Sequence, residues 1–185
     1  MTMIERGWLR QARRLTSPNC DARPAGEAIS LLVVHGISLP PRQYGGCYIE
    51  DLFCNRLDPA AHPYFAEIAE LRVSAHVLIR RDGELLQFVP FAKRAWHAGV
   101  SCFQGRERCN DFSIGVELEG CDDEPYEPIQ YRRLAQVTRG LMAAYPGITP
   151  ERIVGHCDIA PGRKSDPGAA FDWGEFRRLL AGDQS

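Results

Sequence analysis

The chain has 185 residues, of which 44% are hydrophobic and 25% charged, and these values suit one soluble globular domain. Its formal net charge of -2 gives no electrostatic case for binding nucleic acid or an anionic membrane. No apolar run approaches the roughly 20 residues of a membrane helix, and residues 1–8 lack a signal-peptide core. We therefore expect a cytoplasmic protein.

The seven cysteines predict no disulfide framework, because their number is odd and no signal peptide precedes them. No C-x-x-C pair occurs, so a cysteine-rich zinc site is not predicted either. We expect several small buried thiols in a reducing cytosol. Cys157 adjoins His156, but neighbours in an extended segment point to opposite sides, so it is not expected to be a metal ligand.

The first half of the chain predicts three segments: a central strand at 30–34, short helical pieces within 49–71, and a hairpin of strands 74–80 and 84–89. The first is a continuous apolar run, which is typical of a strand buried on both faces. Pro59 and Pro63 interrupt the helical pieces. Asp82-Gly83 lies between the last two runs and is a strong hairpin signal.

The second half predicts a polar loop at 92–111, a strand at 112–119, a helix at 129–145, a short strand at 153–154 and a last helix from 172 to about 180. Alternation places one polar and one apolar face on the strand; Phe112, Ile114, Val116 and Leu118 share the apolar face. Pro128 fits the first turn of the long helix, and the last helix opens on a capping-box pattern. With no repeats or linker, we expect one α/β domain over 1–185, with a central mixed sheet flanked by helices.

Two histidines follow apolar strands that lie far apart in the chain. His35 ends the run at 30–34, and His156 comes just after the short strand at 153–154. Asp166 follows ten residues later in a segment that reads as a loop from its proline and glycine content. Two histidines and one carboxylate are the usual ligands of a hydrolytic zinc site, whose fourth position stays open. Singly, each residue also fits a structural histidine or a turn-forming aspartate, and both interpretations stay open at this point.

Two further residues carry charge chemistry next to this set. Glu117 lies on the polar face of its strand near Gly115, whose missing side chain leaves room for a ligand, and could take a proton from an attacking water. The alternative is a surface carboxylate on an edge strand, which also describes Glu119. Lys164 could stabilise a developing oxyanion, the alternative being a solvated loop lysine.

The remaining histidines and the arginines give weaker signals. His76 alternates in phase with Leu78, so we expect a structural role. His97 stands beside Trp96 in the polar loop and is expected to contact substrate. Three arginines could bind carboxylates bidentately, although isolated arginines are usually solvated: Arg72, Arg106 and Arg108.

Several segments together resemble the AmpD amidases, cytosolic members of the wider zinc amidase and peptidoglycan-recognition fold. They are VHGISLPP at 34–41, RVSAH at 72–76, RAWHAG at 94–99, NDFSIGVELEG at 110–120, and GHCDIAPGRKSDPG at 155–168. The resemblance runs from about 7 to 176. It implies a single domain with a central mixed sheet flanked by helices.

The resemblance also implies a reaction and a site. The reaction is hydrolysis of the amide between N-acetylmuramic acid and L-alanine in cell-wall recycling, with 1,6-anhydromuropeptides as favoured small-molecule substrates. In bacteria with an inducible β-lactamase, it also removes the inducing muropeptide. No nucleic acid, membrane or obligate protein partner is implied. By motif position, His35, His156 and Asp166 bind one Zn²⁺ per chain, Glu117 and Lys164 are catalytic, and the groove is lined by Trp96, Arg72 and Arg108.

One position departs from the family pattern. The family commonly has Asn after its first zinc ligand, whereas this chain has Gly36. An amide there would hydrogen-bond the substrate beside the reacting bond, so we expect Gly36→Asn to raise catalytic efficiency. A positive φ at this glycine would remove that gain.

Two rivals share this fold. A non-catalytic peptidoglycan-recognition module would often lack a metal ligand, whereas all three expected ligands and both catalytic residues are present here. An exported amidase acting on the intact wall would carry a signal peptide and fewer cysteines. We therefore expect the cytosolic enzyme.

Overall fold

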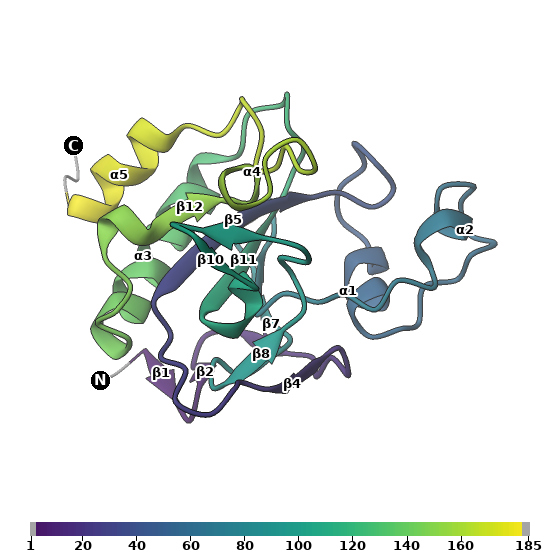
Figure 1. Cartoon of the computed structure of the whole chain (residues 1–185). Helices are drawn as coiled ribbons and strands as arrows, with labels where there is room; N and C mark the ends of the chain where they lie inside the picture. Colours follow the sequence, from purple (N-terminus) through teal and green to yellow (C-terminus); the bar gives the residue numbers. More distant parts are fainter. Residues whose placement is uncertain (1–2, 183–185) are drawn as a thin grey trace.

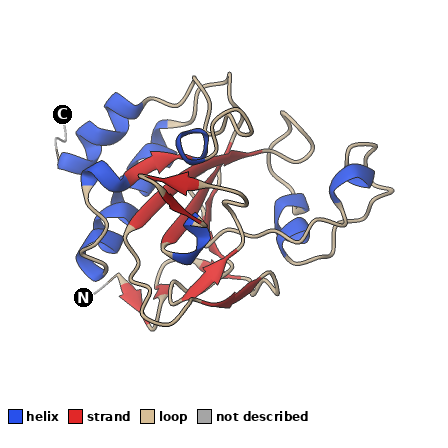
Figure 2. Cartoon of the chain, in the orientation of Figure 1, coloured by secondary structure: helices blue, strands red, loops and turns tan. Residues whose placement is uncertain are grey.

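The computed structural model describes residues 3–182. Its centre is a mixed six-stranded sheet, in the order β12 (Ile153–Gly155), β5 (Leu31–Ile37), β11 (Ser113–Glu119), β6 (Val77–Ile79), β7 (Leu85–Gln87) and β3 (Arg13–Arg14). The first four strands run parallel, and β7 pairs antiparallel with β6. Figure 2 shows this sheet between helices on one side and loops with short helices on the other.

Short elements surround the sheet. Within the described residues, three strand pairs lie outside it: β1 (Ile4–Glu5) with β2 (Trp8–Leu9), β4 (Cys20–Ala22) with β8 (Lys93–Ala95), and β9 (Cys102–Phe103) with β10 (Arg106–Glu107). The α-helices are α1 (Tyr48–Phe53), α2 (Phe65–Ile68), α3 (Pro128–Ala144), α4 (His156–Ile159) and α5 (Trp173–Ala181). Two 3₁₀ turns cover Cys109–Asp111 and Pro150–Arg152. The mixed sheet flanked by helices confirms the expected fold class.

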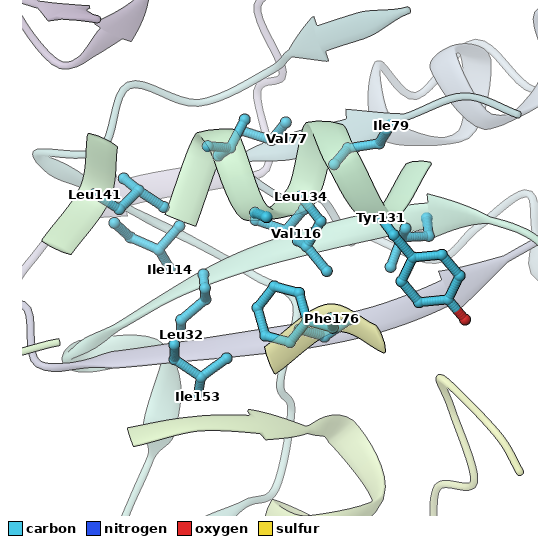
Figure 3. Close-up of a cluster of buried hydrophobic side chains, with 14 of the residues drawn as sticks. Leu32, Val77, Ile79, Ile114, Val116, Tyr131, Leu134, Leu141, Ile153 and Phe176 are labelled. Carbon is cyan, nitrogen blue, oxygen red and sulfur yellow. The ribbon is translucent and has the colours of Figure 1, made fainter. Parts of the chain in front are cut away.

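Helices α3 and α5 cover one face of the sheet. Figure 3 shows α3 lying across the strands, with apolar side chains of both elements meeting between them. Leu32 and Val116 of the strands and Leu134 of the helix are fully buried in this cluster. Burying such a side chain contributes about 1.5–3 kcal/mol, so this layer is the main apolar core. Pro128 begins α3 as predicted, and Asp172 Oδ1 accepts from the Glu175 N–H at 2.9 Å, which is one of the two bonds of the predicted capping box.

The opposite face of the sheet carries the polar residues singled out above. In β5, Leu32 and Val34 face α3, so alternation turns Val33 and His35 to the other side. In-register pairing with β11 sets His35 directly beside Glu117. Loops cover this face. Figure 1 shows α1, α2 and their connecting loop extending away from the central sheet.

The structure corrects several expectations about local structure. Strand β5 continues to Ile37, so His35 lies inside it rather than at its end. The segment 92–111 contains β8, β9 and β10, and 156–159 is a helical turn rather than loop or extended chain. Phe112 precedes β11 and packs with Leu31 on the polar side of the sheet. The two- and three-residue strands β1 to β4 were not predicted, because they are too short to show a period.

Two expectations about side chains were also wrong. Glu119 is only 2% exposed, because it accepts from the buried Arg80 guanidinium at 3.0 Å and from the Gly45 N–H at 2.6 Å. The cysteines are all free thiols, as expected, but only Cys109 is buried, and Cys47 and Cys102 are exposed.

No helix within residues 3–182 is both long and apolar enough to cross a membrane.

His76 has the structural position expected for it. It is fully buried, its Nδ1 accepts from the Gly115 N–H at 3.1 Å, and its Nε2 lies 3.1 Å from the Lys93 carbonyl oxygen. Burial, and then the charge of Arg23, lower the pKa of His76 to about 3. The folded protein therefore holds this imidazole neutral.

A pH dependence of stability follows from His76. Between its ordinary pKa of 6.5 and the folded value of about 3, the unfolded chain binds a proton that the folded one excludes. The free energy of unfolding should therefore fall as pH falls through this window, by up to about 1.4 kcal/mol per pH unit from this residue. Urea unfolding from pH 7 to 4, with chelator present throughout, should give a shallower slope for His76→Gln than for the wild type. Equal slopes would contradict this assignment.

Candidate active site

Three ligand-type atoms converge on the polar side of the sheet. His35 Nδ1 lies 3.0 Å from His156 Nδ1 and 3.2 Å from Asp166 Oδ2, and His156 Nδ1 lies 3.1 Å from the same oxygen. Both imidazoles are buried, and the Asp166 side chain is 15% exposed. Within residues 3–182, this is the group of three His, Cys, Asp or Glu side chains placed to hold a metal ion. The sequence prediction brought together the same three residues.

The fold brings these atoms together from distant parts of the chain. Strand β12 pairs with β5 so that Gly155 lies beside Val34, the neighbour of His35, and His156 begins α4 directly after Gly155. The loop then returns: the Cys157 N–H donates to the Asp166 carbonyl oxygen at 3.0 Å. This bond sets Asp166 next to His156. The Cys157 thiol is outside the cluster, although it lies in a helical turn and not in the extended segment we assumed.

The site favours the protonation states that bind a cation. Burial is the largest influence on His35 and lowers its pKa to about 4, so the imidazole is neutral at pH 7. Burial alone would raise the pKa of Asp166, but the His156 and His35 imidazoles beside it outweigh burial and keep that pKa below its usual range. Neutral imidazole and ionised carboxylate are the ligand forms that a metal requires. The donor set therefore fits a divalent cation.

Glu117 stands beside this cluster with an unpaired oxygen. Its side chain is 8% exposed, and its buried Oε2 has no hydrogen-bond partner among the described residues. Burial, and then the charge of Asp166, raise the pKa of Glu117 well above its ordinary value, while Lys164 opposes the shift. An unsatisfied buried carboxylate is costly in a structural role. The alternative of an exposed surface carboxylate is therefore wrong.

These residues open into one cavity of about 550 Å³. His35, His156, Asp166, Glu117 and Lys164 all line it. Leu52, Tyr64, Leu71 and Val73 give it an apolar wall, while Cys121, Asp122 and Asp123 line another part of it. The cavity thus combines a metal-type cluster, an unpaired carboxylate, a lysine and an apolar wall.

Of the residues expected to contact substrate, some line the cavity and others do not. Trp96 and His97 line the cavity, but the His97 ring also lies against His35, with Nδ1 2.9 Å from His35 Nε2. Neither Arg72 nor Arg108 is among the lining residues of the described chain. The Arg72 guanidinium turns back to the carbonyl of Ala69 at 3.4 Å. Arg108 is 70% exposed and lines a separate hollow with Arg163.

Gly36 lines the cavity, but a side chain at that position would point elsewhere. An added Cβ would lie 2.3 Å from the hydroxyl of Tyr126, a residue buried in the core beneath α3. That hydroxyl donates to the Pro167 carbonyl at 2.9 Å. The φ of Gly36 is not positive, so backbone strain is not the obstacle. The expected gain from Gly36→Asn is wrong in its premise, because the side chain would meet Tyr126 and not a substrate amide.

Other residues at the site were missed. The apolar wall comes from 48–73, which the sequence marks only as short helical pieces, so no signal for it existed. Ser113 bonds to the His97 ring at 3.1 Å, and it could have been found, because it shares the polar face of β11 with Glu117. Gly115 does not leave the room for a ligand that the sequence predicted. An added Cβ there would lie 2.5 Å from His97 Cγ, so the space is filled by the His97 ring.

Comparison with known proteins identifies the family. The model of the N-acetylmuramoyl-L-alanine amidase family matches residues 25–169. The 1,6-anhydro-N-acetylmuramyl-L-alanine amidase AmpD of Salmonella typhimurium strain SL1344 is 64% identical over 177 residues, which cover 96% of this chain and 94% of that protein. AmpD of Haemophilus influenzae is 57% identical, with 94% of both chains covered.

Solved structures agree with this grouping. The crystal structure of a selenomethionine AmpD derivative has a TM-score of 0.94 and 61% identity, and covers 97% of this chain and 99% of that one. The amidase AmiD of E. coli was solved with anhydro-N-acetylmuramic acid-L-Ala-D-gamma-Glu-L-Lys as substrate; it is 31% identical, with a TM-score of 0.59, and covers 84% of this chain and 60% of that one. The chain therefore belongs to the N-acetylmuramoyl-L-alanine amidase family and, within it, to the AmpD type.

Proposed function

We propose that this protein hydrolyses the amide between N-acetylmuramic acid and L-alanine of muropeptides, with 1,6-anhydromuropeptides as its substrates. One observation carries the proposal: the His35, His156 and Asp166 donors converge beside the unpaired Glu117 carboxylate in one cavity. The names of the AmpD relatives, which match over nearly the whole of both chains, supply the substrate class.

The metal proposed for the cluster is one Zn²⁺ per chain, held by His35, His156 and Asp166. Two neutral imidazoles and one carboxylate, with no thiolate, are typical of catalytic zinc sites, which leave one position open. When bound, zinc polarises a carbonyl group and acidifies water to a pKa of roughly 7. The cluster opens into the cavity, so a substrate can reach it.

Glu117 is the proposed acid and base. Its unpaired Oε2 can accept the proton of a water that attacks the lactyl carbonyl. The same oxygen can then deliver that proton to the alanine nitrogen, which leaves poorly as an unprotonated amine. Burial favours the protonated form of this carboxyl group, so the group holds the proton between the two steps.

Lys164 and the cavity wall complete the proposal. The Lys164 ammonium lines the cavity and can stabilise the oxyanion that develops on the attacked carbonyl. Trp96 and the apolar wall offer contact area for the sugar ring and the peptide. Arg72 and Arg108 lie outside the cavity. They would contact only those parts of a substrate that extend beyond the cavity.

We further propose that the reaction serves cell-wall recycling in the cytoplasm, on small-molecule muropeptides and without an obligate protein partner. The rival, a non-catalytic muropeptide-binding module, would not need a complete ligand set or a buried carboxylate without a hydrogen-bond partner. Incubating the protein with an anhydromuropeptide distinguishes the two, because only the enzyme releases a free peptide with an alanine N-terminus.

Metal removal tests the zinc site. Purified protein should contain one zinc per chain, exhaustive chelation should abolish hydrolysis, and added Zn²⁺ should restore it, because the three donors leave the cation available to substrate. His35→Ala and His156→Ala should lose metal and activity together. Metal content is read by elemental analysis and activity by peptide release. Full activity in metal-free protein would reject the zinc site.

Substitution of Glu117 separates catalysis from metal binding. Glu117→Gln keeps the side-chain shape and should keep zinc, but should lose about a hundredfold or more in kcat, the usual scale for an acid-base group. Lys164→Met should lose a similar factor while retaining zinc. Glu70→Gln is the matched control, since that side chain is 94% exposed. Near-normal kcat in zinc-loaded Glu117→Gln would place the base elsewhere.

A further inference from the structure

The two ligand histidines are each held at the nitrogen that faces away from the cluster. His35 Nε2 lies 2.9 Å from His97 Nδ1, and His156 Nε2 lies 3.2 Å from the Ala98 carbonyl oxygen. A neutral imidazole that presents Nδ1 as a ligand must carry its proton on Nε2. A carbonyl oxygen can only accept, so Ala98 sets this tautomer for His156. For His35, the group at Nε2 is the ring of His97, which can either donate or accept.

The His97 ring is fixed by its surroundings. Its Nε2 lies 3.1 Å from Ser113 Oγ, which can accept a hydrogen bond. One face of the ring fills the space above Gly115, where an added Cβ would lie 2.5 Å from His97 Cγ. The backbone N–H groups of His97 and Ala98 both donate to Asn110 Oδ1, at 3.1 Å and 2.8 Å. Ring and backbone are thus positioned independently.

We propose that His97 is a positioning residue that holds His35 in the tautomer with Nδ1 free for the metal. His35 Nε2–H donates to His97 Nδ1, and His97 Nε2–H donates to Ser113 Oγ. The opposite direction would place the proton on His35 Nδ1 and block that ligand. This inference rests on the proposed function in one respect, since it presupposes a cation at the His35, His156 and Asp166 cluster. It replaces the expectation that His97 serves as a substrate contact.

Zinc affinity, measured by competition with a chromophoric chelator, tests this role. His97→Phe retains a ring but no acceptor, and should weaken zinc binding about 10- to 100-fold, the usual effect of losing a partner of a metal-bound histidine. His97→Gln, whose amide oxygen can accept from His35 Nε2, should recover part of that loss. His62→Phe is the control, because His62 lies outside the cluster and packs on Phe65. Its zinc affinity should equal that of the wild type.

Metal-free thermal unfolding separates positioning from a general structural role. If His97→Phe loses stability without zinc but binds zinc as tightly as the wild type, the proposal is overturned. If His97→Phe does not fold, Gly115→Ala serves instead, since its methyl group displaces the ring. Unchanged zinc affinity in that variant also overturns the proposal.

The positioning role and the proposed function can fail separately. If the wild type binds zinc but hydrolyses no muropeptide, and His97→Phe binds zinc more weakly, the positioning role is supported and the proposed function is rejected. Wild-type protein that binds no zinc rejects both.

Discussion

The site depends on the parallel, in-register pairing of β5 with β11. This pairing sets His35 beside Glu117 on the same face, and β12 on the other side of β5 delivers His156. A shift of one residue in either strand would turn His35 or Glu117 toward α3. The apolar residues between the sheet and α3 therefore do more than stabilise the fold: by choosing which side chains face the helix, they also choose which face the cavity.

Turning polar side chains inward has a cost that the neighbouring residues offset. Buried imidazoles and carboxylates destabilise a fold unless each polar atom finds a partner. Here the outer nitrogens of His35 and His156 face His97 and the Ala98 carbonyl, and Glu119 is paired with Arg80. Glu117 keeps one buried oxygen unpaired among the described residues. Two residues apart on one strand face, Glu119 is thus paired within the structure, whereas Glu117 lines the cavity.

The sequence predicts the long elements and the central cluster, and it fails where the information is not local. The apolar run before His35 and the alternation of β11 identify both strands, but no local pattern says that they pair across about eighty intervening residues. The wall around Tyr64 and the contact of Gly36 with Tyr126 depend on how loops pack, which periodicity does not describe. The contact between His97 and His35 joins residues 62 positions apart, so no local pattern predicts it.

The cavity wall belongs to a different hydrophobic cluster from the core beneath α3. Tyr64, Ile68 and Val73 pack with Phe53 and Phe65 in a cluster separate from the one under α3. Ile37 of β5 and Leu78 of β6 also pack in this cluster, and Leu78 pairs with Glu117, so replacing this segment would reach the strands of the site at these two residues. A different segment between β5 and β6 could therefore reshape the cavity wall without disturbing His35 and Glu117 only if it preserved the packing against Ile37 and Leu78.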